Sequence, residues 1–337
     1  MKRMMGVLLL LLAACGESKE TRLQRFLLQS NDMITNRKED EAEHFLQEAL
    51  KLDSCFADAW NNLGTLHFNK LKFREALNDY DHAIGCRPDY LDAYLNRANT
   101  AYELKEYYSA LKDIDKVIQH KPDTAVAYFS KGLIHTRLRE FDKAMNAFKR
   151  AQTLDPKNAE VLVNLGTVHY YKKQFDSARL NFEQALRLNA KEGNAYNALA
   201  LVDLELQHYD QAKLNLAKAL ALHPDDPYFL NNRGYVSLLT NDIEKGKTDI
   251  DASIGIDPYN GWAYRNKGIY YLQTRQYADA LRLLKQAEGI DPFIEHLYYY
   301  LGEAHRLAGD NSAACASYAK AIERNEVPKD AHLPKCN

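Results

Sequence analysis

Residues 57–90 read ADAWNNLGTLHFNKLKFREALNDYDHAIGCRPDY, and this 34-residue block sets the pattern for most of the chain. From Ala57 to Pro328 the sequence divides without an insertion into eight such blocks. Residues of the same kind recur at the same block positions. Position 8 is small throughout: Gly64, Ala98, Gly132, Gly166, Ala200, Gly234, Gly268 and Gly302. A 34-residue period that persists over eight blocks predicts a repeat protein.

Each block predicts two amphipathic helices that pack closely against each other. Position 20 is alanine in seven blocks and Gly246 in the remaining one, so the helix backbones can approach at positions 8 and 20. Position 24 carries a large apolar residue in each block, beginning with Tyr80, to fill the space beside the small ones. Proline at position 32 of six blocks ends the second helix, because proline cannot continue it.

These positions, together with the aromatic residues at position 4, resemble the tetratricopeptide repeat family. The resemblance implies an all-α fold, a right-handed superhelical solenoid of helix-turn-helix repeats. Residues 23–56 fall in the same register, with Ala42, Leu46 and Ala49 in repeat positions, and are interpreted as a divergent capping repeat. Eight gapless repeats are then expected over 57–328, followed by a short C-terminal tail over 329–337.

The amino terminus predicts export and lipid attachment. A basic start at Lys2 and Arg3 precedes an apolar run that is too short to span a bilayer, which favours a secretory signal over residues 1–14. The run ends in Leu-Ala-Ala-Cys15, which resembles the bacterial lipobox and implies that Cys15 is lipidated. Residues 15–22 would be the anchor and a polar tether, and Gly16 after the cysteine favours the outer membrane. The alternatives are an ordinary signal with an incidental cysteine, or a short buried helix.

Composition excludes few functions but disfavours one class of partner. The chain has 337 residues, 46% of them hydrophobic and 27% charged, and a formal net charge of −2. A nucleic-acid partner would need a basic stripe, and the sequence offers none. No metalloprotease, phosphate-loop or hydrolase motif occurs, so we expect no enzyme activity and no cofactor.

Histidines and cysteines offer the remaining chemistry. His67, His135, His169 and His305 share position 11, an aromatic position in the family, and are expected to pack between helices rather than bind a metal. An exported protein can oxidise its cysteines, and the tail is long enough to bring Cys336 to Cys315. A Cys55–Cys86 pair is also feasible but requires Cα atoms within about 7 Å. Free thiols are the alternative for all four.

The resemblance implies that the first helix of each repeat lines a concave groove. Position 6 is asparagine in five blocks, which is similar to the asparagine ladder of O-linked N-acetylglucosamine transferases that holds extended peptides. The later blocks add apolar and aromatic residues that favour a partner surface. Alternatively, these side chains fill a tight superhelix and meet no ligand. The predicted groove residues are Asn62, Asn96, Asn164, Asn232, Asn266, Tyr228, Tyr235, Trp262, Arg265, Leu238, Ile269 and Tyr299.

The expected function is therefore that of a lipid-anchored scaffold or adaptor that binds a protein or extended peptide. It would act in the assembly or regulation of a bacterial cell-envelope complex and would touch the membrane only through its lipid. The alternatives are a regulator of an envelope enzyme, or a cytosolic adaptor if the amino terminus is not processed. The sequence identifies neither the partner nor the oligomeric state.

Overall fold

The computed structural model describes residues 17–328, 331 and 333–336, and all regular structure in these residues is helical. The all-α prediction is confirmed. The helices form two compact units, one ending at Pro156 and the other beginning at Lys157, which we call unit 1 and unit 2. Cys15 and the predicted signal sequence lie outside the described residues, so lipidation and processing stay predictions.

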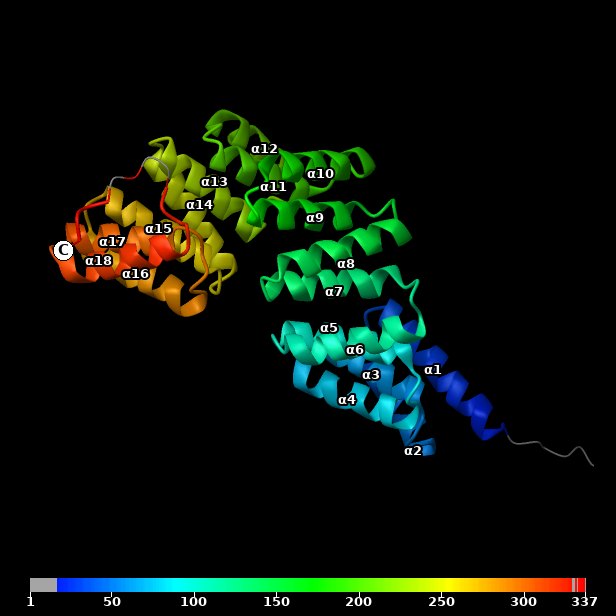
Figure 1. The fold of residues 1–337 in the computed structure, drawn as a ribbon. Coiled ribbons are helices and arrows are strands. Elements are labelled where there is room, and N and C mark those ends of the chain that lie inside the picture. Colours follow the sequence, from blue (N-terminus) through cyan, green and yellow to red (C-terminus); the bar gives the residue numbers. More distant parts are fainter. Residues whose placement is uncertain (1–16, 329–330, 332, 337) are drawn as a thin grey trace, which may run out of the picture. The chain divides into compact units, whose positions relative to one another are not determined.

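Unit 1 contains four helix pairs, each of which is one repeat (Figure 1). The two helices of a pair pack along their length, and within unit 1 the second helix of each of the first three pairs also packs against the first helix of the next. The pairs are α1 (Lys19–Thr35) with α2 (Glu39–Leu52), α3 (Ala57–Asn69) with α4 (Phe73–Cys86), α5 (Leu91–Glu103) with α6 (Tyr107–His120), and α7 (Ala125–Arg137) with α8 (Phe141–Leu154).

Unit 2 contains five pairs built in the same way. Its first helices also contact one another from repeat to repeat. The pairs are α9 (Ala159–Tyr171) with α10 (Phe175–Leu188), α11 (Gly193–Glu205) with α12 (Tyr209–Leu222), α13 (Pro227–Leu239) with α14 (Ile243–Ile256), α15 (Gly261–Gln273) with α16 (Tyr277–Ile290), and α17 (Leu297–Leu307) with α18 (Asn311–Glu323).

The turn inside each repeat has one backbone conformation. The Leu71 amide donates to the Phe68 carbonyl and the Lys72 amide donates to the His67 carbonyl, which closes the end of α3 in the manner of a Schellman motif. This turn needs a left-handed residue at block position 15, and φ there lies between 58° and 61° in eight repeats. Only the last repeat uses glycine, Gly309, at this position. The residues concerned are Arg37, Leu71, Lys105, Arg139, Lys173, Gln207, Asn241 and Arg275.

Small residues at position 8 make room for a large apolar side chain at position 24, as the sequence predicts. A Cβ atom on Gly132 would lie 2.4 Å from the ring of Phe148, which is itself fully buried. The glycine at Gly246 has a similar cause, because a Cβ there would lie 2.7 Å from Leu238 on the paired helix. The repeat core therefore depends on close approach of the two helices rather than on large side chains from both.

Two boundaries differ from the sequence predictions. The polar tether expected over residues 15–22 is partly helical, because the Ser18 side chain accepts from the Thr21 amide and starts α1 at Lys19. Every other first helix in the eight-block region begins at block position 1, but α17 begins at Leu297, two residues late. His296 there adopts a left-handed conformation, and its Nδ1 lies 2.5 Å from the Glu326 carbonyl oxygen.

Candidate partner-binding faces

The first helix of each repeat presents one stripe of residues, at block positions 2, 6, 9 and 13. This 4-3-4 spacing places the four side chains on one helix face. We call these residues the first-helix stripe. In unit 1 the stripe consists of Gln24, Leu28, Asn31 and Thr35 on α1, Asp58, Asn62, Thr65 and Asn69 on α3, Asp92, Asn96, Asn99 and Glu103 on α5, and Val126, Ser130, Leu133 and Arg137 on α7.

Asparagines of unit 1 form a hydrogen-bonded chain along this stripe. Nδ2 of Asn96 donates to Oδ1 of Asn61 at 3.0 Å. Nδ2 of Asn61 donates to Asn62 at 3.3 Å, and Asn62 donates to Oδ1 of Asn31 at 3.1 Å. The chain ties three successive first helices together. Asn61 is buried, but the other members stay close to solvent, since Asn31 is exposed and Asn62 and Asn96 are partly exposed.

Unit 2 contains the same chain, and one end of it is buried. Asn266 donates to Asn231 at 2.8 Å, Asn231 donates to Asn232 at 3.3 Å, and Asn232 donates to Asn197 at 2.8 Å. Arg265 extends it, because Nε and Nη2 donate to Oδ1 of Asn266 at 2.9 and 2.7 Å. Asn266 has no exposed surface and Asn231 only 1%. The fifth predicted asparagine, Asn164, donates instead to the Glu160 carbonyl of its own helix.

Aromatic side chains close over the chain in unit 2. The Arg265 guanidinium lies 4.7 Å from the Tyr235 ring centroid and 5.1 Å from that of Trp262. The Tyr235 hydroxyl lies 3.3 Å from the hydroxyl of Tyr300, two repeats further along the chain. Contacts between non-neighbouring repeats show that this face of unit 2 is filled by its own side chains.

Four of the predicted groove residues are therefore corrected. Leu238, Arg265, Asn266 and Ile269 are at most 4% exposed, because the face on which they lie is closed. They belong to the interior of unit 2, as the tight-superhelix alternative expects. Tyr228 remains 49% exposed, while Trp262, Tyr235 and Tyr299 are partly exposed. Whether a partner contacts these four aromatic residues stays a prediction.

A polar cluster joins the first and last repeats of unit 2. The Tyr170 hydroxyl on α9 lies 3.3 Å from Oε1 of Glu205 on α11 and 3.3 Å from Oε2 of Glu295, just before α17. His296 Nε2 lies 3.9 Å from Glu205. Nζ of Lys173 donates to the Asn325 carbonyl at 2.8 Å, and this contact adds a second link between the two ends.

The pKa values of the two carboxyl groups in this cluster are shifted in opposite directions. Burial and the nearby Glu205 charge raise the pKa of Glu295 above its ordinary value. Burial alone would also raise the pKa of Glu205, but His296 and the Tyr170 hydroxyl outweigh it and lower that pKa. This cluster could not be predicted from the sequence. Its members lie up to 125 residues apart, and no local pattern joins them.

The four histidines at position 11 each contact a different polar partner. His67 Nδ1 lies 2.5 Å from Asp79, His135 Nδ1 lies 2.6 Å from Glu140, and His169 Nδ1 lies 2.7 Å from Gln174. His305 Nδ1 lies 4.0 Å from Asp310. Each contact is inside one repeat. Over residues 17–328, 331 and 333–336, no three potential metal ligands come together.

All four cysteines after Cys15 are paired. Cys55 and Cys86 form a disulfide with a Cα–Cα distance of 5.3 Å, and Cys315 and Cys336 form another at 5.6 Å. The first links the loop that follows α2 to the last residue of α4. The second attaches the C-terminal tail to α18.

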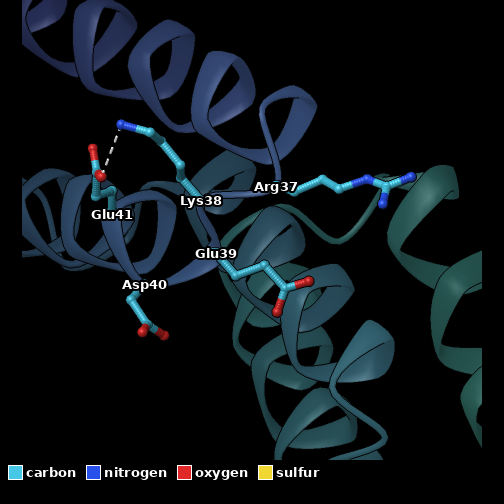
Figure 2. A pocket seen from close by; sticks show the side chains of 5 residues that line it. All are labelled: Arg37, Lys38, Glu39, Asp40 and Glu41. Carbon is cyan, nitrogen blue, oxygen red and sulfur yellow. Dashed lines mark ion pairs between the residues drawn. The ribbon is translucent and has the colours of Figure 1, made fainter.

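One open hollow lies at the turn between α1 and α2, lined by Arg37, Lys38, Glu39, Asp40 and Glu41 (Figure 2). Lys38 is ion-paired with Glu41 at 3.0 Å across it, and all five residues are exposed. A hollow with only charged, solvated side chains does not resemble a small-molecule site, which is mostly apolar.

Among the described helices, none is both long and apolar enough to cross a bilayer.

Family models described as tetratricopeptide repeat match residues 62–119, 125–158, 159–191, 197–260 and 265–330. The chain belongs to the tetratricopeptide repeat family. No curated protein sequence matches it. Repeats of this family generally serve as scaffolds that bind other proteins.

Solved structures agree with this tetratricopeptide repeat fold. A chain of the crystal structure of the APC/C hetero-tetramer Cut9-Hcn1 is 18% identical, with a TM-score of 0.63, and the match covers 92% of this chain. This chain spans only 62% of the length of that one. The structure of pilF from Pseudomonas aeruginosa is 15% identical with a TM-score of 0.55, over 63% of this chain and 96% of pilF. At these identities the likeness concerns the fold alone.

Proposed function

We propose that this chain is a lipid-anchored scaffold of a bacterial cell envelope, and that it binds a protein partner on the first-helix stripe of unit 1. The observation that carries the binding site is the contrast between the two units. At block positions 6 and 9, α5 of unit 1 keeps Asn96 partly exposed and Asn99 exposed, whereas the equivalent Asn266 and Ile269 on α15 of unit 2 are buried. An accessible polar face on a repeat stack is available to a partner without rearrangement.

Two features support the envelope location. The first is the Leu-Ala-Ala-Cys15 sequence after a short apolar run, with its resemblance to the lipobox. The second is independent of it: four of the five cysteines form two disulfides, and disulfides persist in oxidising compartments such as the bacterial periplasm. A repeat scaffold held by its lipid would act close to the membrane surface.

Replacing the lipidated residue tests the anchoring. We expect Cys15→Ser to move the protein from the detergent-extracted membrane fraction into the soluble fraction, or to leave an unprocessed precursor. Cell fractionation with intact-mass measurement distinguishes these products. A variant that stays membrane-bound with a normally processed amino terminus would show that lipid does not anchor the chain.

Site-specific photocrosslinking in cells tests the binding face. A photoreactive residue in place of Asn99, which is exposed on the α5 stripe, should crosslink one defined partner. The matched control is Tyr108 on α6, which is 75% exposed but lies outside the stripe. Equal capture at both positions, or capture only at Tyr108, would contradict the proposed face.

A further inference from the structure

The α5 part of the stripe has an arrangement of free polar groups that no other stripe of unit 1 has. Asp92 and Glu103 stand at its two ends, both exposed, and neither forms an ion pair with any residue that the structure describes. The equivalent carboxylate on α3, Asp58, is neutralised by Arg87 at 2.6 Å. Only α5 therefore offers two uncompensated negative charges on this face.

Of the two asparagines between these carboxylates, one has an available hydrogen-bond acceptor and the other an available donor. Asn96 uses its Nδ2 on Asn61, so its Oδ1 is the group that remains available. Asn99 uses its Oδ1 to accept from the Ser130 hydroxyl at 3.4 Å, so its Nδ2 remains available. Within the described residues, neither Oδ1 of Asn96 nor Nδ2 of Asn99 has a further hydrogen-bond partner. One free acceptor and one free donor match the N–H and C=O groups of a peptide main chain.

We infer that α5 binds an extended peptide segment carrying two basic side chains on one side of the peptide, about four or six residues apart. Asp92 and Glu103 are eleven residues apart, which corresponds to about 16 Å along a helix axis. An extended chain rises about 3.3 Å per residue and spans this distance in about five residues. Since alternate side chains point to the same side, two basic residues that both face α5 are separated by about four or six residues. Lysine or arginine at the two ends pairs with the carboxylates, and Asn96 and Asn99 hold the main chain between them. This inference rests on the proposed binding face and adds the chemistry of the partner.

The test is a selection of random twelve-residue peptides, displayed on phage, against the full chain purified in detergent. We expect the enriched peptides to carry lysine or arginine at positions i and i+4 or i and i+6. A synthetic enriched peptide should bind about tenfold more weakly to Asp92→Asn/Glu103→Gln, because two exposed ion pairs are lost. Its affinity should also fall as salt is raised. Moving one basic residue three positions closer to the other should weaken binding to a similar degree.

A matched double variant removes the same two charges elsewhere on unit 1. Glu75→Gln/Asp89→Asn changes exposed carboxylates on α4 and in the loop after it, outside the stripe, and should leave the affinity unchanged. Thermal melts followed by circular dichroism check that both double variants are folded. Absence of enrichment, enrichment of peptides without the basic pair, or equal affinity for the two double variants would overturn the inference.

Photocrosslinking at Asn99 separates this failure from failure of the proposed function. If a partner is captured there and its crosslinked segment lacks two spaced basic residues, the peptide chemistry is wrong and the binding face stands. If capture at Asn99 does not exceed that at Tyr108, the binding face itself is wrong.

Discussion

The two units carry the same asparagine pair in the same place, yet use it differently. Asn61–Asn62 in unit 1 and Asn231–Asn232 in unit 2 occupy positions 5 and 6 of their repeats, and each pair bonds to the repeats on both sides. In unit 1 the chain ends at partly exposed Asn96. In unit 2 it ends at Arg265, which is 4% exposed and covered by Tyr235 and Trp262.

The difference shows that residue type at a repeat position does not by itself identify a binding site. In both units, asparagine at position 6 forms a hydrogen bond with an asparagine of a neighbouring repeat, so its presence there does not require a ligand. What distinguishes the units is whether the stripe is closed from outside, which in unit 2 depends on Tyr170, Glu295 and Tyr300 reaching across non-neighbouring repeats. The closed part of the unit 2 stripe is on α15, where Asn266 and Ile269 are buried, whereas no stripe residue of α5 is buried.

The largest expected effect comes from breaking the buried asparagine chain. Asn266→Ala leaves the buried Arg265 guanidinium without the acceptor of two of its hydrogen bonds, so we expect it to lower the free energy of unfolding by about 3 kcal/mol. Asn96→Ala removes one bond at a partly exposed site and should cost about 1 kcal/mol. Urea denaturation measures both, and hydrogen exchange shows which unit is affected.

Asn266→Asp serves as the control for this comparison. It keeps an acceptor for Arg265 and loses only the donation to Asn231, so it should be less destabilising than Asn266→Ala. Equal losses for Asn266→Ala and Asn96→Ala would show that burial does not distinguish the two chains.

A smaller effect is expected from opening the contact between the ends of unit 2. Tyr170→Phe removes the hydroxyl that bonds Glu205 and Glu295 and should cost about 1 kcal/mol. Amide exchange should become faster in α17, which follows Glu295 directly. In unit 1, Tyr102→Phe removes a single bond from Arg137 at an exposed site and should change exchange little. Unchanged exchange in α17 would show that this cluster does not hold the face closed.

The smallest effect is a pH-dependent one at Glu295. Because its pKa is raised in the folded state, this group contributes stability at low pH that is lost as the pH rises through that pKa. Glu295→Gln removes the buried charge and keeps an acceptor for Tyr170, so at pH 7 it should raise Tm by about 1–2 °C. The difference from wild type should shrink toward pH 4, where the wild-type carboxyl becomes protonated.

Glu103→Gln is the matched variant for this pH comparison, since Glu103 is exposed on the stripe of unit 1. Its Tm should follow that of the wild type at both pH values. Thermal melts at pH 7 and pH 4 measure the two variants side by side. If Glu295→Gln lowers Tm at pH 7, the charged carboxylate stabilises the cluster, and the expectation that removing this charge raises Tm is wrong.

Much of the fold could be predicted from particular residues. Small residues such as Gly132 opposite rings such as Phe148 predicted the pairing of helices, and proline at position 32 predicted where second helices end. The late start of α17 could not be predicted, because it depends on a contact between His296 and the Glu326 carbonyl, 30 residues away. Nor could the partners of Asn96 and Asn266 be predicted, since an asparagine can bond a ligand, a neighbour or water equally well.

The sequence by itself determined the repeat: its length, its helix pairs and the positions that pack between them. It could do so because helical periodicity, small residues and proline act within one block of 34 residues. Only the tertiary structure decided which stripe is open. That outcome depends on contacts such as Tyr170 with Glu295, 125 residues apart, which exist only where the intervening repeats are stacked. The same side chains on a less closed stack would have faced solvent.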